Sequence, residues 1–275
     1  MQVKFYTPHP LLQDFVQCIM VVDYKTDANN GPTIYHYPPT PQASLFFYIE
    51  DPIKVKGEGS ALFLEQPHSV IVGQQITPVT IDLNRNHKAV RVGFHPSGLH
   101  RLLRFSMAES IDGHYNAEDV FGRPITEVNE QLHGATDSDA IKAIVECFLL
   151  KKARAVAPLL PFDRAMRELL KSNGNIPIEK IASLACLSLR QFERVSKERI
   201  GLPPKLFARI VRFSKAYRLR EEQPHLSWTG IAFECGYFDQ MHLIRDFKQF
   251  AGVAPRTLQK NLHKTSLRMQ IDLRL

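Results

Sequence analysis

The 275-residue sequence lacks the features of several protein classes. It has no run of 18 apolar residues, so we expect no transmembrane helix. Residues 1–20 lack a charged segment followed by an apolar block, so we expect no signal peptide. The four cysteines, Cys18, Cys147, Cys186 and Cys235, form no CxxC pair. We interpret them as reduced structural thiols of a cytosolic protein, with Cys186 and Cys235 at buried positions.

Signatures of catalysis and metal binding are also missing. Eight histidines precede residue 140, and none belongs to an H-x-H or H-E-x-x-H pair: His9, His36, His68, His87, His95, His100, His114 and His133. We therefore predict no metal site and no cofactor. The sequence has no G-x-S-x-G motif and no P-loop, and the apolar runs around Cys18 and Cys147 predict unreactive thiols. These features favour a protein that is not an enzyme.

Charge is distributed unevenly along the sequence. Residues 1–160 carry 14 Lys and Arg against 17 Asp and Glu, whereas residues 161–275 carry 21 against 11. The net charge is therefore −3 in the first part and +10 in the second. This asymmetry predicts a polyanionic partner for the second part and a different role for the first.

The first part is predicted to contain strands followed by helices. Short apolar or alternating runs at 15–24, 43–50, 69–75, 78–83 and 88–96 are typical of a β-sandwich or barrel. The period then becomes helical, with Ser97 as the expected N-cap of one helix and further helices over 117–133 and 137–151. The apolar stripe of the last helix, which includes Ile141, Val145 and Leu149, could cap the strands or pair with a second copy in a dimer.

We therefore expect an α+β protein of two domains. Residues 1–152 would form a cupin-like β-barrel with its following helices, and 153–161 would be a linker. Residues 162–262 would form an all-α domain, followed by a tail over 263–275. Seven helices are predicted in that domain, at about 162–172, 178–185, 189–200, 204–221, 227–235, 240–250 and 255–262.

An internal repeat occupies the last hundred residues. Ile181-Ala182 recurs as Ile231-Ala232 at a step of 50, and Arg194 recurs as Arg245 at a step of 51. The repeat predicts two copies of a helix–turn–helix unit, with one extra residue in the second turn. Two such units on one body can read two stretches of a DNA major groove.

Residues that can form the turn and cap the second helix are found in both units. Cys186 and Gly236 occupy the position where the turn requires a small residue or one that tolerates positive φ. Ser188 and Asp239 are the expected N-caps of the two recognition helices. Between the units, a helix of about 17 residues from Pro204 would span about 25 Å. Because the major groove repeats about every 34 Å along one face, a mismatch would have to be absorbed by bending the DNA.

The outward faces of the two recognition helices are predicted to contact DNA. Arg can form two hydrogen bonds with guanine, and Gln can do so with adenine. Lys197, Arg199 and Lys248 are better placed for phosphates. Glu193 could accept from cytosine or hold Arg194, and Met241 could touch a thymine methyl or pack. The predicted DNA-binding residues are Arg190, Gln191, Glu193, Arg194 and Lys197 in the first unit, and Gln240, Met241, His242, Arg245 and Lys248 in the second.

Residues 231–259, IAFECGYFDQMHLIRDFKQFAGVAPRTLQ, resemble the C-terminal signature of the AraC/XylS family of transcription regulators. Residues 178–207 resemble the less regular first unit of that family, and the resemblance covers about 160–262. It implies a seven-helix domain whose recognition helices enter successive major-groove segments. It assigns base contacts to Arg190, Glu193, Arg194, Gln240, Met241, His242 and Arg245. Ser196 stands where the family usually has Phe, and Leu258 stands where it often has Tyr. Both differences affect packing and not the assignment.

The resemblance also implies properties of the whole chain. AraC-like proteins often carry a cupin-like barrel that binds an effector or dimerises, and residues 7–24 resemble the start of an uncharacterised N-terminal domain of such regulators. We expect a cytoplasmic, one-component regulator that binds promoter DNA and has no membrane partner. Contact with RNA polymerase and activation are implied by the resemblance alone. A small-molecule effector and a homodimer are possible partners. Two alternative functions are left open: an enzyme tethered to DNA, as in AraC-like repair methyltransferases, and an architectural DNA-bending protein.

Overall fold

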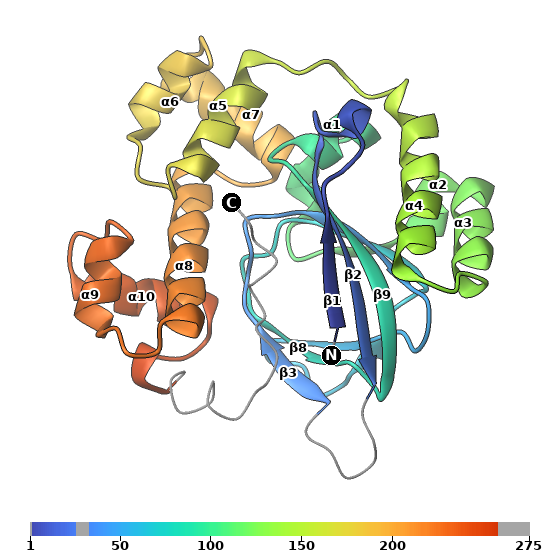
Figure 1. Cartoon of the computed structure of the whole chain (residues 1–275). Helices are drawn as coiled ribbons and strands as arrows, with labels where there is room; N and C mark the ends of the chain where they lie inside the picture. Colours follow the sequence, from blue (N-terminus) through green and yellow to red (C-terminus); the bar gives the residue numbers. More distant parts are fainter. Residues whose placement is uncertain (1, 26–32, 258–275) are drawn as a thin grey trace.

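A computed structural model describes residues 2–25 and 33–257, which form a β-rich half and a helical half (Figure 1). The β-rich half extends to residue 153 and has its own buried core, which includes Phe15, Leu45 and Phe47. The helical half begins at residue 161 and has a second core, which includes Phe192 and Phe247. The predicted α+β class is confirmed. In the described ranges, no helix is long and apolar enough to cross a membrane.

The strands of the β-rich half form two antiparallel sheets. The larger sheet has the order β1-β2-β9-β4-β7-β10, and the smaller has the order β3-β8-β5-β6. A closed cupin-like barrel remains a prediction. The strand bounds are β1 Gln2–Tyr6, β2 Val16–Lys25, β3 Ile34–Tyr37, β4 Ser44–Tyr48, β5 Lys54–Gly57, β6 Leu64–Glu65, β7 Ser69–Val72, β8 Val79–Asp82, β9 Asn86–Phe94 and β10 His114–Asn116.

The five predicted runs correspond to β2, β4, β7, β8 and β9. Their apolar residues are largely buried, as in β7, where all four residues are buried. Five further strands were not predicted: β1, β3, β5, β6 and β10. These strands are two to five residues long, and β5 has the sequence KVKG. Such short segments show too few alternations to give a periodic signal.

Helices lie beside the larger sheet and at its upper end (Figure 1). They are α1 Gly98–Leu103, α2 Ala117–Phe121, α3 Arg123–His133 and α4 Ser138–Ala153, with 3₁₀ turns η1 Pro10–Leu12 and η2 Met107–Ser110. The single helix expected over 117–133 is wrong, because Gly122 adopts φ 65° and separates α2 from α3. Ile141, Val145 and Leu149 of α4 are fully buried in the core of the β-rich half. That stripe therefore caps the strands and cannot pair with a second copy.

Ser97 precedes α1 as expected, but it does not cap the helix through its side chain. It adopts a left-handed φ of 63°, and its hydroxyl makes no capping hydrogen bond. Instead, Ser97 Oγ donates to Asp163 of the helical half at 2.5 Å. The side-chain cap expected at the start of α1 is thus replaced by a hydrogen bond between the two halves.

The helical half follows the predicted repeat closely. Its helices are α5 Pro161–Lys171, α6 Ile178–Leu184, α7 Leu189–Ile200, α8 Pro204–Glu222, α9 Trp228–Glu234 and α10 Gln240–Phe250. The bounds of α6 and α9 differ by 50 residues, and the starts of α7 and α10 differ by 51. The seventh predicted helix, 255–262, has helical residues at 255–257, and its remainder lies outside the described residues together with Leu258 and the tail.

Helix α8 runs between the α6–α7 pair and the α9–α10 pair (Figure 1). It has 19 residues and is therefore about 28 Å long. Its Ile210, Phe213 and Tyr217 are buried, and the Phe213 ring lies 5.0 Å from that of Phe247 on α10. These residues form an apolar stripe along α8, and Leu206 is partly buried against the same core.

Candidate DNA-binding surface

The two turns share one backbone geometry. Cys186 adopts φ 57° and Gly236 adopts φ 72°, so both stand at the left-handed position that the sequence predicted. Cys235 is buried, which confirms the prediction for that residue. Cys186 is exposed, so the prediction of its burial is wrong. Cys147 is exposed too, so its position in an apolar run did not indicate burial.

Side-chain caps fix the start of each recognition helix. Ser188 Oγ accepts from the backbone N of Gln191 at 3.3 Å, and Gln191 Oε1 accepts from the backbone N of Ser188 at 3.0 Å. Asp239 Oδ1 accepts from the backbone N of His242 at 2.8 Å and lies 2.9 Å from His242 Nδ1. These hydrogen bonds hold the pKa of Asp239 below its usual value. The first turns of α7 and α10, where base contacts usually arise, are therefore held in place.

The predicted division of the two recognition helices into an inner and an outer face is confirmed. Phe192, Leu243 and Phe247 are fully buried, and Val195 is partly buried. All ten predicted contact residues are exposed: Arg190, Gln191, Glu193, Arg194, Lys197, Gln240, Met241, His242, Arg245 and Lys248. The structure thus places five of them on α7 and five on α10. Their contacts with DNA remain predictions.

Some of these side chains already have partners on their own unit. Gln191 uses its carbonyl oxygen in the capping box, which leaves its amide group for a ligand. Arg194 lies 3.4 Å from Glu198, one turn further along α7, and not against Glu193 as the sequence allowed. Gln240 Oε1 accepts from Thr229 Oγ1 of α9 at 3.4 Å. These contacts are exposed and weak, so DNA can replace them at low cost.

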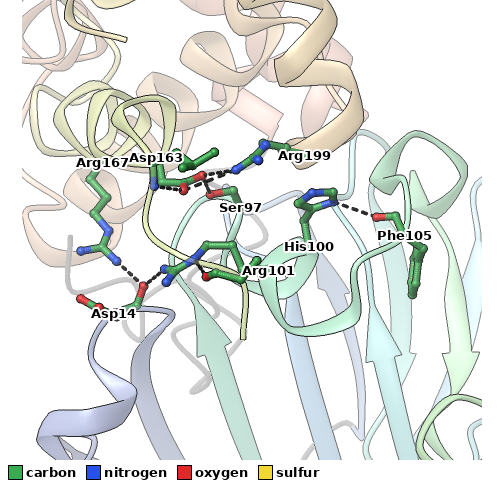
Figure 2. A network of polar contacts seen from close by, with 10 residues as sticks. Asp14, Ser97, His100, Arg101, Phe105, Asp163, Arg167 and Arg199 are labelled. Atoms are coloured by element: carbon green, nitrogen blue, oxygen red, sulfur yellow. Dashed lines mark hydrogen bonds and ion pairs between the residues drawn. The ribbon is translucent and has the colours of Figure 1, made fainter. Parts of the chain in front are cut away.

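Arg199, which was expected to contact phosphate, is engaged inside the protein. Its Nη1 lies 3.1 Å from Oδ1 of Asp163, and only 17% of its side chain is exposed (Figure 2). Asp163 is fully buried and also accepts from Ser97 Oγ and from the backbone N of Leu160. The expectation for Arg199 is therefore wrong, because the buried carboxylate holds this guanidinium away from solvent.

Both recognition helices end against the β-rich half. Gly201 caps α7 with φ 93°, and a Cβ on it would lie 2.7 Å from the carbonyl oxygen of Met107 in η2. The carbonyl oxygen of Ala251, which caps α10, accepts from His36 Nε2 of β3 at 2.8 Å. No sequence signal could have revealed these contacts, because each joins residues that are far apart in the chain.

The contacts around Asp14 extend this junction between the halves (Figure 2). Arg101 of α1 and Arg167 of α5 both donate to the carbonyl oxygen of Asp14. Arg101 Nε also donates to the carbonyl oxygen of Ala157 at 2.8 Å, in the segment that connects the two halves. Burial lowers the pKa of both arginines from the usual value, but a guanidinium stays charged at neutral pH.

Basic residues of α8 hold the two units rather than forming a free surface. Arg209 Nη2 lies 2.6 Å from Asp246 of α10, and Lys215 Nζ donates to the carbonyl oxygen of Glu234 at 2.9 Å. Arg212 Nη2 donates to the carbonyl oxygen of Gly174 at 2.9 Å, and its guanidinium lies 5.4 Å from the centre of the Tyr237 ring. Arg212 therefore touches both the loop before α6 and the turn before α10.

The geometry defines a class of protein with two equivalent helix–turn–helix units on one helical body. Residues 181–261 match a family model described as a helix-turn-helix domain, and residues 4–116 match a domain of unknown function, DUF6597. Residues 181–261 are thus similar to the DNA-binding domain of AraC/XylS-family regulators, and residues 4–116 are similar to a domain of unknown function.

Similar proteins agree with this assignment. The activator RhaS of Klebsiella pneumoniae (strain 342) is 34% identical over 177 residues, which are 60% of this chain and 63% of RhaS. An uncharacterised HTH-type transcriptional regulator of Haemophilus influenzae is 34% identical over 86 residues, which are 31% of this chain and 28% of that protein. The chain thus covers less than two thirds of the length of these relatives. A crystal structure of ToxT from Vibrio cholerae shares the fold with a TM-score of 0.51 at 14% identity, over 90% of this chain and 99% of ToxT.

Proposed function

We propose that this chain is a sequence-specific DNA-binding transcription regulator and not an enzyme. The observation that carries the proposal is the pair of capped, equivalent helices α7 and α10, which present ten exposed residues from corresponding faces. Six of these residues are Arg, Lys or His, and two are Gln, which suits both phosphates and base edges. The family and the activator RhaS among the relatives support this function.

In this proposal the two parts of the chain have separate roles. Residues 162–262 bind promoter DNA in the cytoplasm, and residues 1–152 sense an effector or mediate assembly, with 153–161 as the linker. Helix α8, about 28 Å long, sets the separation of the two units, and bending of the DNA absorbs the difference from the groove repeat of about 34 Å. Activation through RNA polymerase is the expected outcome, because the RhaS relatives are named as activators.

The proposal is tested by selecting genomic fragments that the full chain binds and by comparing Arg245→Ala with the parent protein. We expect Arg245→Ala to weaken binding to the selected site by about 1–3 kcal/mol and to relax one base position. Binding to random DNA should change little. Lys248→Gln is the matched control on the same helix, and it should weaken binding to both DNAs equally because Lys248 is expected to contact phosphate.

Two results would contradict the proposal at different levels. Equal losses on both DNAs for Arg245→Ala would show that this residue contacts only phosphate. A parent protein that binds random and selected DNA with the same affinity would contradict sequence-specific regulation and would favour the architectural alternative.

A further inference from the structure

The extra residue of the second turn can be located from the backbone. The backbone N of Leu187 donates to the carbonyl oxygen of Ala182 at 3.1 Å, and that of Tyr237 donates to Ala232 at 2.9 Å. Leu187 and Tyr237 are therefore equivalent, at a step of 50. The N-caps Ser188 and Asp239 are also equivalent, at a step of 51. Phe238 lies between them and has no counterpart in the first unit.

Phe238 is not used for packing. It is 92% exposed, whereas its neighbour Tyr237 is buried in the core. Its ring lies edge-on to that of His242, with 5.9 Å between the ring centroids. Met241, also in the first turn of α10, is 56% exposed. Two large apolar side chains thus stand in solvent at the start of the second recognition helix.

The first unit presents different chemistry at the matching place. At the step of 51, Met241 corresponds to Arg190, and His242 corresponds to Gln191. The first unit therefore offers a guanidinium where the second offers a thioether and an aromatic ring. In the major groove, the apolar group presented by the bases is the C5-methyl of thymine, and Phe is a residue type that contacts it.

We propose that Phe238 and Met241 read thymine methyl groups, so that the half-site under α10 contains thymine where the half-site under α7 contains guanine. This inference rests on the proposed function. The neighbouring Gln240, His242 and Arg245 are exposed on the same helix, which makes the apolar pair continuous with the predicted DNA-binding surface. The two units, though equivalent in fold, then read unlike sequences and fix the orientation of the protein on its site.

The test replaces each thymine of the selected site in turn by deoxyuridine, which removes the methyl group and keeps the hydrogen-bonding edges. We expect the full chain to lose about four-fold in affinity at one or two positions in the half-site under α10, the effect of one buried carbon group. Phe238→Ser should bind the thymine site more weakly and should be indifferent to deoxyuridine at a position where the parent responds.

Phe233→Ser is the matched control, because Phe233 is an exposed aromatic residue, at 83%, on the first helix of the same unit. It should keep the parent response to deoxyuridine. A parent protein that prefers the selected site over random DNA but shows a flat deoxyuridine profile would overturn the inference and leave the proposed function intact. If Phe238→Ser keeps the parent profile and loses only activation of transcription, Phe238 contacts a protein and the inference is overturned. A parent protein with no preference for the selected site over random DNA would overturn both the inference and the proposed function.

Discussion

Arg199 in the last turn of the first recognition helix forms an ion pair with Asp163 near the start of α5, with 3.1 Å between Nη1 and Oδ1. The same carboxylate accepts from Ser97 Oγ at 2.5 Å and from the backbone N of Leu160 at 2.7 Å. One buried carboxylate thus connects the β-rich half, the start of the helical half and a helix that is proposed to read DNA. Ser97 is therefore linked to α7 by two polar contacts, its hydrogen bond to Asp163 and the ion pair of Asp163 with Arg199.

Asp163→Asn should lower the free energy of unfolding by about 3–5 kcal/mol, because it leaves the mostly buried guanidinium of Arg199 without its charged partner. Urea unfolding followed by circular dichroism measures the change. Glu198→Gln is the control, since it breaks the exposed pair with Arg194 and should cost less than about 1 kcal/mol. Similar losses for the two variants would show that the buried pair is not a major source of stability.

Arg212→Gln should weaken the coupling between the two units, because Arg212 contacts both Gly174 before α6 and Tyr237 before α10. We expect a loss of about ten-fold in affinity for DNA with both half-sites and a smaller loss for DNA with one, measured by gel shift. Lys171→Gln is the control, because exposed Lys171 pairs at 2.9 Å with Glu168 of its own helix, α5. Equal losses for Arg212→Gln on both DNAs would mean that Arg212 does not set the spacing of the units.

Gly236→Ala should destabilise the helical half by about 1–3 kcal/mol. Gly236 has φ 72°, and a Cβ on it would lie 2.5 Å from Oδ1 of Asn175. Cys186→Ala is a matched control at the equivalent turn position, where a side chain is already present at φ 57°, and it should change stability by less than about 0.5 kcal/mol. Thermal unfolding compares the two, and a larger loss for Cys186→Ala would contradict the equivalence of the turns.

Stability should fall in acid because His87 is buried. Burial lowers the pKa of His87 to about 4, against the opposing effect of nearby Asp51. The unfolded chain takes up a proton near pH 6.5 and the folded chain does so only near pH 4, so stability present above pH 6.5 is lost as the pH falls between these values. The loss from this one group is at most about 3 kcal/mol.

Urea unfolding of His87→Gln between pH 7 and pH 4 tests this expectation. The variant should show a shallower decline than the parent protein. The decline should not vanish, because burial also lowers the pKa of His95 to about 4. A parent and a variant with the same pH dependence would show that His87 is not protonated on unfolding in this range.

The sequence predicted the helical half well because its signals are local. The bounds of α7 and α10 agree with the expected helices, since the caps Ser188 and Asp239 and the turn residues Cys186 and Gly236 act within a few residues of each helix. The step from 50 to 51 residues also correctly predicted the extra turn residue. Local chemistry was therefore sufficient for the framework that presents the proposed DNA-binding residues.

The contacts between the halves could not be predicted in this way. Ser97 resembles an N-cap and Arg199 resembles a phosphate-binding residue in the sequence, and both instead contact Asp163. That partner is brought close by the way the two halves pack, and no spacing in the sequence reports it. Short strands such as β5 and β10 escaped notice because their residues pair with distant strands and have little periodicity of their own.

Hydroxyl-radical footprinting of the full chain on its selected site tests the central claim most directly. Two units on one rigid helix predict two protected tracts about 10 base pairs apart on one face of the DNA. Arg194→Ala should weaken protection mainly in one tract, and Arg245→Ala mainly in the other. A single protected tract, or variants that weaken both tracts equally, would contradict the reading of DNA by two separate helices.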